Sequence, residues 1–173
     1  MNKTAITLFS LVLSSSIMSM EIKKTHVPFQ RIVEMCSILR QQVQTDGFEP
    51  DLLVSIARGG DFPGAVLASA HAFDNRHKVS INVASYGDDH QQRELKLLFP
   101  VHTEDYKDFK SILVVDDIAD TGDTLKFVTE LLAKGVPTAT IKTAVLFYKL
   151  RSKVKPDYYI EETEDWIVFP WEK

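Results

Sequence analysis

A strand that runs directly into a polar turn and a helix constrains the fold of this chain most. Residues 112–115 are four consecutive branched apolar residues, as is typical of a strand buried on both faces in a parallel sheet. Two aspartates follow them, and residues 118–124 then read Ile-Ala-Asp-Thr-Gly-Asp-Thr. From Leu125 onward, apolar residues recur at helical spacing until Gly135 ends the helix. This pattern predicts an α/β protein with a polar turn between strand and helix.

The polar turn has the residues of a ligand site. In open α/β sheets, ligands bind where strands end and helices begin. The hydroxyls of Thr121 and Thr124, with backbone N–H groups at the helix start, form an anion site that suits a phosphate. The carboxylates of Asp116, Asp117 and Asp120 must therefore face something else: sugar hydroxyls, a metal ion, or a proton to be moved.

Three other motifs do not fit this turn. The calcium-loop pattern D-x-D-x-D-G fails on spacing, and the Gly-Lys-Thr of the Walker sequence is absent. A haloacid-dehalogenase phosphatase would need its acids one residue apart, whereas Asp116 and Asp117 are adjacent. An acidic, solvated turn that only caps a helix is the structural alternative.

A glycine-rich turn forms a second candidate anion loop upstream. Residues 52–57 are predicted to form a short apolar strand, and residues 65–73 a small apolar helix. Between them lies Arg-Gly-Gly-Asp-Phe-Pro-Gly, with Asp61 expected as the helix N-cap. Four of the seven glycines lie in the two turns, where backbone is expected to approach a ligand: Gly59, Gly60, Gly64 and Gly122.

Residues 112–124 resemble the phosphoribosyl-diphosphate (PRPP) binding motif of the type I phosphoribosyltransferases: four hydrophobics, two acids, two variable residues, then Asp-Thr-Gly-x-Thr. Arg58-Gly59-Gly60 resembles the pyrophosphate loop of that family, which often carries a non-proline cis peptide bond. The resemblance extends over about residues 22–172 and is nearest to bacterial xanthine–guanine and hypoxanthine phosphoribosyltransferases. It implies a parallel sheet flanked by helices, with a small hood built from both chain ends.

The resemblance also implies the site residues. The residues implied for PRPP binding are Arg58, Gly59, Arg93, Asp116, Asp117, Ile118, Ala119, Asp120, Thr121, Gly122, Asp123 and Thr124. It implies Mg²⁺ as cofactor, with Asp117 at the metal, and Asp120 as the catalytic residue that handles a proton near N7 of the base. Adjacent side chains of an extended chain point oppositely, so Asp116 and Asp117 are not expected to act as one acid pair.

A lid is expected after the strand at residues 79–86. Residues 87–96 are polar and long enough for a mobile surface loop. Ser85 and Tyr86, followed by residues 92–96, resemble the lid of xanthine–guanine enzymes, which closes over the reacting centre and excludes water. Arg93 would then meet the pyrophosphate.

The purine base is expected to bind near Lys149, which follows a strand predicted at residues 138–148. An ammonium group donates hydrogen bonds but accepts none, so Lys149 favours a purine with an oxo group at C6. By the resemblance of residues 165–172 to the family's hood, Trp166 stacks on the base and the backbone of Ile167 reads the purine edge. Ordinary packing is the alternative role of a lone Trp.

The resemblance implies a purine salvage enzyme: Mg²⁺-dependent transfer of ribose 5-phosphate from PRPP to xanthine, guanine or hypoxanthine, giving the nucleoside monophosphate and pyrophosphate. A homo-oligomer, dimer or tetramer, is expected. One alternative is an RNA-binding regulator with the same fold, but a net charge of −4 and the absence of a Lys/Arg run argue against nucleic acid. Another is transfer to a different base. A receiver-like signalling domain would place its acids after the first strand.

The size, 173 residues, suits one globular domain, expected over residues 20–173. Residues 1–19 combine an early Lys3, an apolar stretch and serines, like a secretory signal. Since PRPP is cytosolic, we interpret them as a non-functional extension before Met20, too short to span a membrane, and expect a cytoplasmic protein. Cys36 is the only cysteine, which excludes an internal disulfide, and is expected in the core.

A chain that begins at Met20 should fold and retain full activity, because every predicted motif follows that residue. Solubility, circular dichroism and turnover of the shortened chain check this. An inactive short chain, or a mature protein that N-terminal sequencing shows to be cleaved after export, would contradict the cytoplasmic assignment.

Overall fold

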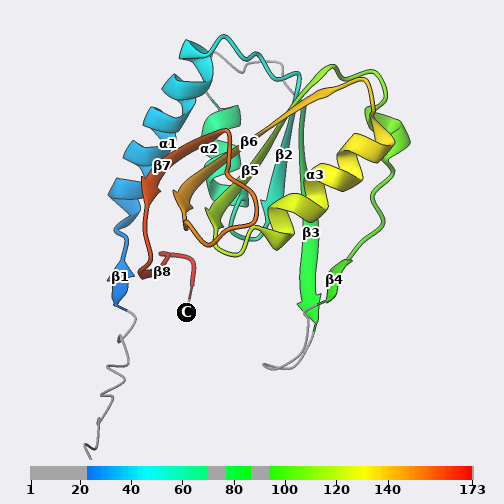
Figure 1. Cartoon of the computed structure of the whole chain (residues 1–173). Coiled ribbons are helices and arrows are strands. Elements are labelled where there is room, and N and C mark those ends of the chain that lie inside the picture. Colours follow the sequence, from blue (N-terminus) through cyan, green and yellow to red (C-terminus); the bar gives the residue numbers. More distant parts are fainter. Residues whose placement is uncertain (1–22, 70–76, 87–93, 173) are drawn as a thin grey trace, which may run out of the picture.

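The computed structural model of the protein describes residues 23–69, 77–86 and 94–172 (Figure 1). Its elements in chain order are β1 (Lys24–His26), α1 (Phe29–Thr45), β2 (Leu52–Ala57), α2 (Asp61–Ala68), β3 (His77–Tyr86), β4 (Glu94–Leu97), the 3₁₀ helix η2 (Thr103–Tyr106), β5 (Ser111–Ala119), α3 (Asp123–Gly135), β6 (Thr140–Tyr148), β7 (Tyr158–Glu162) and β8 (Trp166–Val168). Strands alternate with helices through much of the chain, which is the order that builds parallel sheets.

In the described part of the chain, the central sheet has the strand order β4-β3-β2-β5-β6-β7. Its neighbouring strands are parallel except β3 and β4, which are antiparallel. The chain places β3 on one side of β2 and β5 on the other, so the strand order reverses between β2 and β5. Ligands of open α/β sheets bind beyond the carboxyl ends of the strands at such a switch point. Both predicted turns, after β2 and after β5, lie there.

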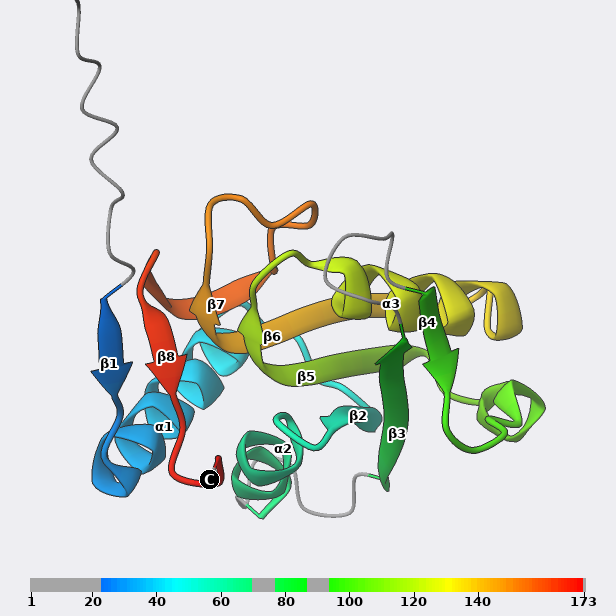
Figure 2. The same ribbon diagram turned by 90° about the horizontal axis from the view of Figure 1, so that it is seen from below.

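Helices cover both faces of this sheet, as Figure 2 shows with α3 on one side and α1 and α2 on the other. Side chains of a strand alternate between faces. In β5, Leu113 and Val115 pack in the core beneath α1 and α2, and Ile112 and Val114 pack in the core beneath α3. All four are fully buried. The continuous apolar run of β5 is thus explained, and the predicted helix-flanked parallel sheet is confirmed.

The two ends of the described chain lie side by side as a small hood (Figures 1 and 2). β1 and β8 pair in parallel, with Thr25 opposite Ile167. The hydroxyl of Thr25 donates to Asp165 Oδ2 at 2.6 Å, which ties the turn before β8 to β1. An ion pair between Arg31 and Glu161 joins α1, which follows β1, to β7, which precedes β8. The hood predicted from both chain ends is confirmed.

Two predicted boundaries are wrong. β5 does not end before the aspartates but continues through both of them, because its pairing with β6 extends to Ala119 opposite Tyr148. The segment predicted as a loop up to residue 96 already forms strand β4 from Glu94, with Glu94 opposite Tyr86. Residues 87–93, which include most of the predicted lid, lie outside the described residues.

The start of α2 also differs from the prediction. The helix begins at Asp61, four residues before the predicted start, and Gly60 takes the N-cap position. Asp61 is therefore not the N-cap. Its carboxylate instead accepts a hydrogen bond from the hydroxyl of Ser80 on β3 at 2.7 Å. A hydroxyl on strand β3 therefore binds the side chain that the sequence alone assigned to the N-terminus of the helix.

Cys36 lies in the core beneath α1, as predicted. Burial raises the pKa of its thiol to about 12, so the thiolate, which is the reactive form, is disfavoured. Among residues 23–69, 77–86 and 94–172, no helix is long and apolar enough to cross a bilayer. The signal-like residues 1–19 lie outside this range, and the single-domain boundary at Met20 stays a prediction.

The fold itself gives a reason for a glycine at position 122. It precedes α3 with a φ of +77°, in the left-handed region. A Cβ atom there would lie 2.3 Å from Ser152 Oγ and 3.0 Å from the backbone nitrogen of Val154. The glycine therefore lets the loop after β6 pack against the polar turn, and the close approach of backbone to a phosphate there stays a prediction.

Gly122→Ala should destabilise the fold more than Gly47→Ala. Both glycines have positive φ, but a Cβ at Gly47 would meet nothing within 4 Å. Left-handed strain alone should cost about 1–2 kcal/mol at Gly47, and the clash should add about 1–3 kcal/mol at Gly122. Urea unfolding of both variants measures the difference. Equal losses would mean that the loop after β6 moves aside freely.

Candidate active site

A cleft of about 1140 Å³ opens at the carboxyl ends of β5 and β6. Its walls come from the turn after β5, the start of α3, the loop after β6, and strands β4 and β8. Predicted site residues that line it are Asp120, Thr121, Asp123, Thr124 and Trp166. The fold therefore brings the predicted phosphate turn and the predicted base-stacking residue to one opening.

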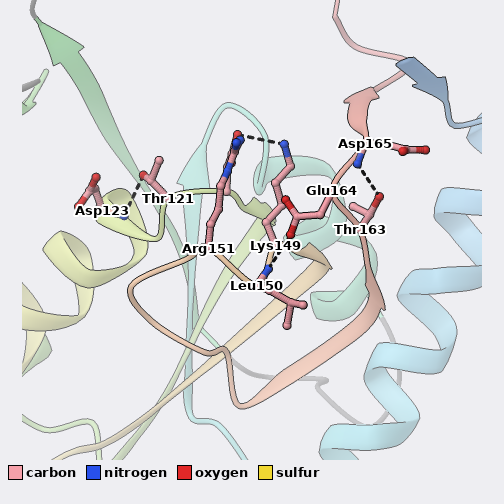
Figure 3. A network of polar contacts seen from close by, with 9 residues as sticks. Thr121, Asp123, Lys149, Leu150, Arg151, Thr163, Glu164 and Asp165 are labelled. Carbon is pink, nitrogen blue, oxygen red and sulfur yellow. Dashed lines mark hydrogen bonds and ion pairs between the residues drawn. The ribbon is translucent and has the colours of Figure 1, made fainter. Parts of the chain in front are cut away.

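Asp120 lines this cleft and contacts two cations, Lys149 and Arg151, which are labelled in Figure 3. Lys149 follows β6, its side chain is only 2% exposed, and its Nζ lies 3.4 Å from Asp120 Oδ2. Arg151 donates from Nε to Asp120 Oδ1 at 2.8 Å and forms a second contact from Nη2 to the same oxygen. The backbone N–H of Lys149 donates to the carbonyl of Ala119 at 3.0 Å, so the pairing of β5 with β6 sets this cluster.

The phosphate turn is fastened to the loop after β6. The carbonyl of Thr121 accepts from the backbone N–H of Lys153 at 2.8 Å. The ammonium of Lys153 donates to the Asp123 carboxylate at 2.6 Å and holds the pKa of that carboxyl below its usual value. The Thr121 hydroxyl accepts from the Asp123 N–H at 3.4 Å (Figure 3). Asp123 is thus bound by a lysine, beside the exposed hydroxyl of Thr121.

Asp117 brings the two predicted loops into contact. A Cβ on Gly59 would lie 2.2 Å from Asp117 Oδ2, so only glycine fits beside this carboxylate. The preceding peptide bond, between Ala57 and Arg58, is cis, as the resemblance implied. Arg58 is exposed next to this contact. The glycine loop after β2 and the acids of β5 therefore form one site across the switch point of the sheet.

The two adjacent aspartates, of which Asp117 is buried and Asp116 is partly buried, have raised pKa values. Burial raises the pKa of Asp117 to about 6, although the indole N–H of Trp171 opposes the shift. Burial, and then the charge of Asp117, raise the pKa of Asp116 well above its usual value. The Asp117 N–H donates to Asp116 Oδ1 at 2.9 Å. The charge of Asp117 thus disfavours the ionised form of Asp116, and a bound cation would favour the ionised forms of both acids.

Trp171 and Arg151 are among the residues of this site that were not predicted. Trp171, in the tail after β8, donates from its indole N–H to Asp117 Oδ2 at 3.3 Å. Its ring stacks on Phe169 with centroids 4.9 Å apart and an interplanar angle of 9°. The only sign of Arg151 in the sequence is that a second cationic residue follows Lys149 by two positions. The contact of Trp171 could not be read from the sequence, because it forms only where the residues after β8 fold back against β5.

The hood contributes the predicted base-binding residues. Trp166 is 52% exposed and lines the cleft. The Trp166 N–H donates to the carbonyl of Lys23 at 2.8 Å, and the Val27 N–H donates to the carbonyl of Val168 at 3.1 Å. Since alternate residues of a strand point their backbone groups to opposite sides, the N–H and C=O of Ile167 face away from β1. They are oriented to bind a partner other than this strand.

Other predicted site residues are not brought together by the described structure. Ser85 and Tyr86 end β3, and Arg93 lies outside the described residues, so the lid stays a prediction. Ile118 and Ala119 lie within β5, where Ala119 is buried and its carbonyl is bonded to Lys149. Within the described ranges, no group of three or more His, Cys, Asp or Glu residues could hold a metal ion.

Asp117→Asn should stabilise the ligand-free protein near neutral pH. An aspartate whose pKa is raised to about 6 in the fold holds its proton more tightly there than when unfolded, near 4. The contribution of this raised pKa to the free energy of unfolding is fully present below pH ~4 and is lost as the pH rises through ~6. The amide oxygen of the Asn variant can still accept from Trp171, but the variant should not suffer this loss. Its free energy of unfolding at pH 7.5 should exceed that of the unmodified protein by on the order of 2–3 kcal/mol.

Urea unfolding of both proteins at pH 4.5 and 7.5 measures this effect. Asp108→Asn, at an exposed position, is the matched control and should leave the pH dependence unchanged. If Asp117→Asn lost stability at pH 7.5 as well as at pH 4.5, the carboxylate would be held in its charged form by the fold itself.

Comparisons with known proteins agree with this architecture. A family model described as "Phosphoribosyl transferase domain" matches residues 20–172. A xanthine-guanine phosphoribosyltransferase of Gluconobacter oxydans is 35% identical over 123 residues, which cover 69% of this chain and 67% of that protein. The crystal structure of a purine phosphoribosyltransferase from Pyrococcus horikoshii superposes with a TM-score of 0.74 and 31% identity, over 88% of this chain and 95% of that chain. A xanthine-guanine-hypoxanthine phosphoribosyltransferase of Helicobacter pylori gives a TM-score of 0.71 and 27% identity, over 87% and 93%. The chain therefore belongs to the phosphoribosyltransferase family of transferases.

Proposed function

We propose that this enzyme transfers ribose 5-phosphate from PRPP to a 6-oxopurine, xanthine, guanine or hypoxanthine, and releases pyrophosphate in purine salvage. The observation that carries the proposal is the adjacent pair of a buried ammonium, Lys149, and a carboxylate, Asp120, beside the phosphate turn. The relatives named as xanthine-guanine phosphoribosyltransferases support the same class of base.

The pair of Lys149 and Asp120 complements one edge of a 6-oxopurine. The ammonium can donate to O6, and the carboxylate can accept from a proton on N7. Adenine presents an amino donor at C6, which would leave that group and Lys149 unpaired. An unpaired buried polar group costs about 1–3 kcal/mol, and a site built to pair one group discriminates strongly against its absence.

The ribose phosphate would occupy the turn after β5. The first N–H groups of α3 have no partners within the helix and, with the hydroxyls of Thr121 and Thr124, suit the 5-phosphate. The carboxylates of Asp116 and Asp117 would face the ribose hydroxyls. The pyrophosphate would lie against Arg58 and Gly59, and Arg93 would reach it from the lid. Trp166 would stack on the base, with the backbone of Ile167 at its edge.

The residues also fit a magnesium ion that arrives with PRPP. Mg²⁺ binds through one or two carboxylates together with substrate phosphates and waters, so a complete protein cage is not required. Asp117, with Asp116 beside it, would hold the ion, because burial raises the pKa of both acids and a cation offsets that cost. When bound, the ion supplies positive charge to the departing pyrophosphate.

Bond cleavage at the anomeric carbon should be largely dissociative, so the protein mainly positions groups and stabilises developing charge. Asp120 would take the proton that leaves the purine as its nitrogen bonds to the ribose. Trp166 and the closed lid would exclude water, which competes with the base for the reactive carbon. The cytosolic origin of PRPP supports action in the cytoplasm, and we expect a homo-oligomer.

A turnover assay with PRPP, Mg²⁺ and five bases tests the proposal. Guanine, xanthine or hypoxanthine should be converted, whereas adenine and orotate should be essentially unused, and chelation of Mg²⁺ should stop the reaction. Asp120→Asn should lower kcat by ~10²-fold or more while the KM for PRPP changes little, as expected when general acid–base help is lost. Adenine or orotate as the preferred base would overturn the assignment of Lys149, and no turnover with any base would overturn the activity.

A further inference from the structure

We infer that Arg151 is a positioning residue that orients the Asp120 carboxylate toward the base. The inference rests on the proposed function, because it assigns Asp120 Oδ2 as the atom that accepts the N7 proton. Arg151 need not touch the substrate for this role. It would act by holding the other oxygen of the same carboxylate.

The contacts of Asp120 divide its two oxygens between two cations. Both Arg151 donors, Nε at 2.8 Å and Nη2, meet Oδ1. The Lys149 ammonium is nearest to Oδ2, at 3.4 Å. Oδ1 is therefore occupied by the guanidinium, and Oδ2 lies on the side of the buried lysine.

The longer Lys149 contact leaves the ammonium available. Charge-assisted N–H···O bonds are usually 2.7–2.9 Å long, so 3.4 Å is a loose contact. An ammonium has three donors, and one can turn to a purine O6 while Oδ2 accepts from N7. The arrangement thus offers an acceptor and a donor side by side, which is the order that a 6-oxopurine protonated at N7 requires.

The loop that carries Arg151 is anchored on both sides of it. The Leu150 N–H donates to Glu164 Oε1 at 3.3 Å, before Arg151 in the chain. The Lys153 N–H donates to the Thr121 carbonyl at 2.8 Å, after it. Figure 3 shows Arg151 rising from this loop alongside Lys149. The guanidinium therefore approaches Asp120 from a fixed backbone, and its planar fork can set the angle of the carboxylate.

Stability alone does not account for this pair. The side chains of Arg151 and Asp120 are 50% and 37% exposed, and ion pairs this exposed contribute little to folding. Without Arg151, the carboxylate could rotate, because the terminal torsion of Asp is broad. Lys149 would then be its remaining cation and would be drawn from O6 toward Asp120. The expected effect of losing Arg151 is on base recognition and not on melting.

Two analogues of hypoxanthine isolate this effect. 9-Deazahypoxanthine carries a fixed N–H at position 7, 7-deazahypoxanthine carries a C–H there, and both keep the oxo group at C6. Dissociation constants would be measured by calorimetry with Mg²⁺ and pyrophosphate, which cannot donate ribose. The unmodified enzyme should prefer the 9-deaza compound by on the order of 10- to 100-fold, as a charge-assisted hydrogen bond predicts.

Arg151→Gln should reduce this preference about tenfold, and Arg151→Lys, which keeps the charge but loses the planar fork, should reduce it to a lesser extent. Arg31→Gln is the control, since Arg31 also pairs with a carboxylate at similar exposure, 41%, but lies away from the cleft. It should keep the preference within about twofold. Melting temperatures of all variants should agree within a few degrees.

Asp120→Asn separates the role of Arg151 from that of Asp120 itself. Loss of the preference in Asp120→Asn together with its retention in folded Arg151→Gln would overturn the role of Arg151 and leave the proposed function intact. Retention of the preference in Asp120→Asn would overturn both, because Asp120 would then not face N7.

Discussion

The pairing of β5 with β6 up to their carboxyl ends is the constraint on which the site depends. It continues to Ala119 opposite Tyr148, and the first residue after β6, Lys149, donates its backbone N–H to the carbonyl of Ala119. This register places the Lys149 ammonium beside Asp120 and fastens the turn after β5 to the loop after β6. A slip of one residue would turn every side chain of β6 to the opposite face and would separate this donor from its carboxylate.

Asp116 and Asp117 at the end of β5 differ from Asp120 in the turn because their surroundings differ. Asp117 is buried and Asp116 is partly buried, so the pKa values of both rise, and a bound cation would favour their ionised forms. Asp120 is partly exposed and already has two cations against it. Pairs of acids whose environments diverge are suited to different tasks. In our proposal, Asp116 and Asp117 serve the ribose and Mg²⁺, and Asp120 serves the base.

Strand β5, the turn after it, helix α3 and the position of Lys149 could be predicted from the sequence, because each depends on consecutive residues or on local periodicity. The extent of β5 could not, since it depends on pairing with β6. Trp171 and Arg151 escaped prediction because their contacts join segments far apart in the chain. The packing of the loop after β6 against Gly122 could not be predicted, since that loop meets the glycine only in the fold.

Binding of three ligands by calorimetry tests most directly whether the base and the phosphate share the adjacent ends of β5 and β6. The ligands are inosine monophosphate, adenosine monophosphate and ribose 5-phosphate. We predict that ribose 5-phosphate binds, that inosine monophosphate binds on the order of 100-fold more tightly because Lys149 pairs with O6, and that adenosine monophosphate lacks the gain from this pairing. Equal affinity for the two nucleotides would contradict the role of Lys149, and no binding of ribose 5-phosphate would contradict the phosphate turn.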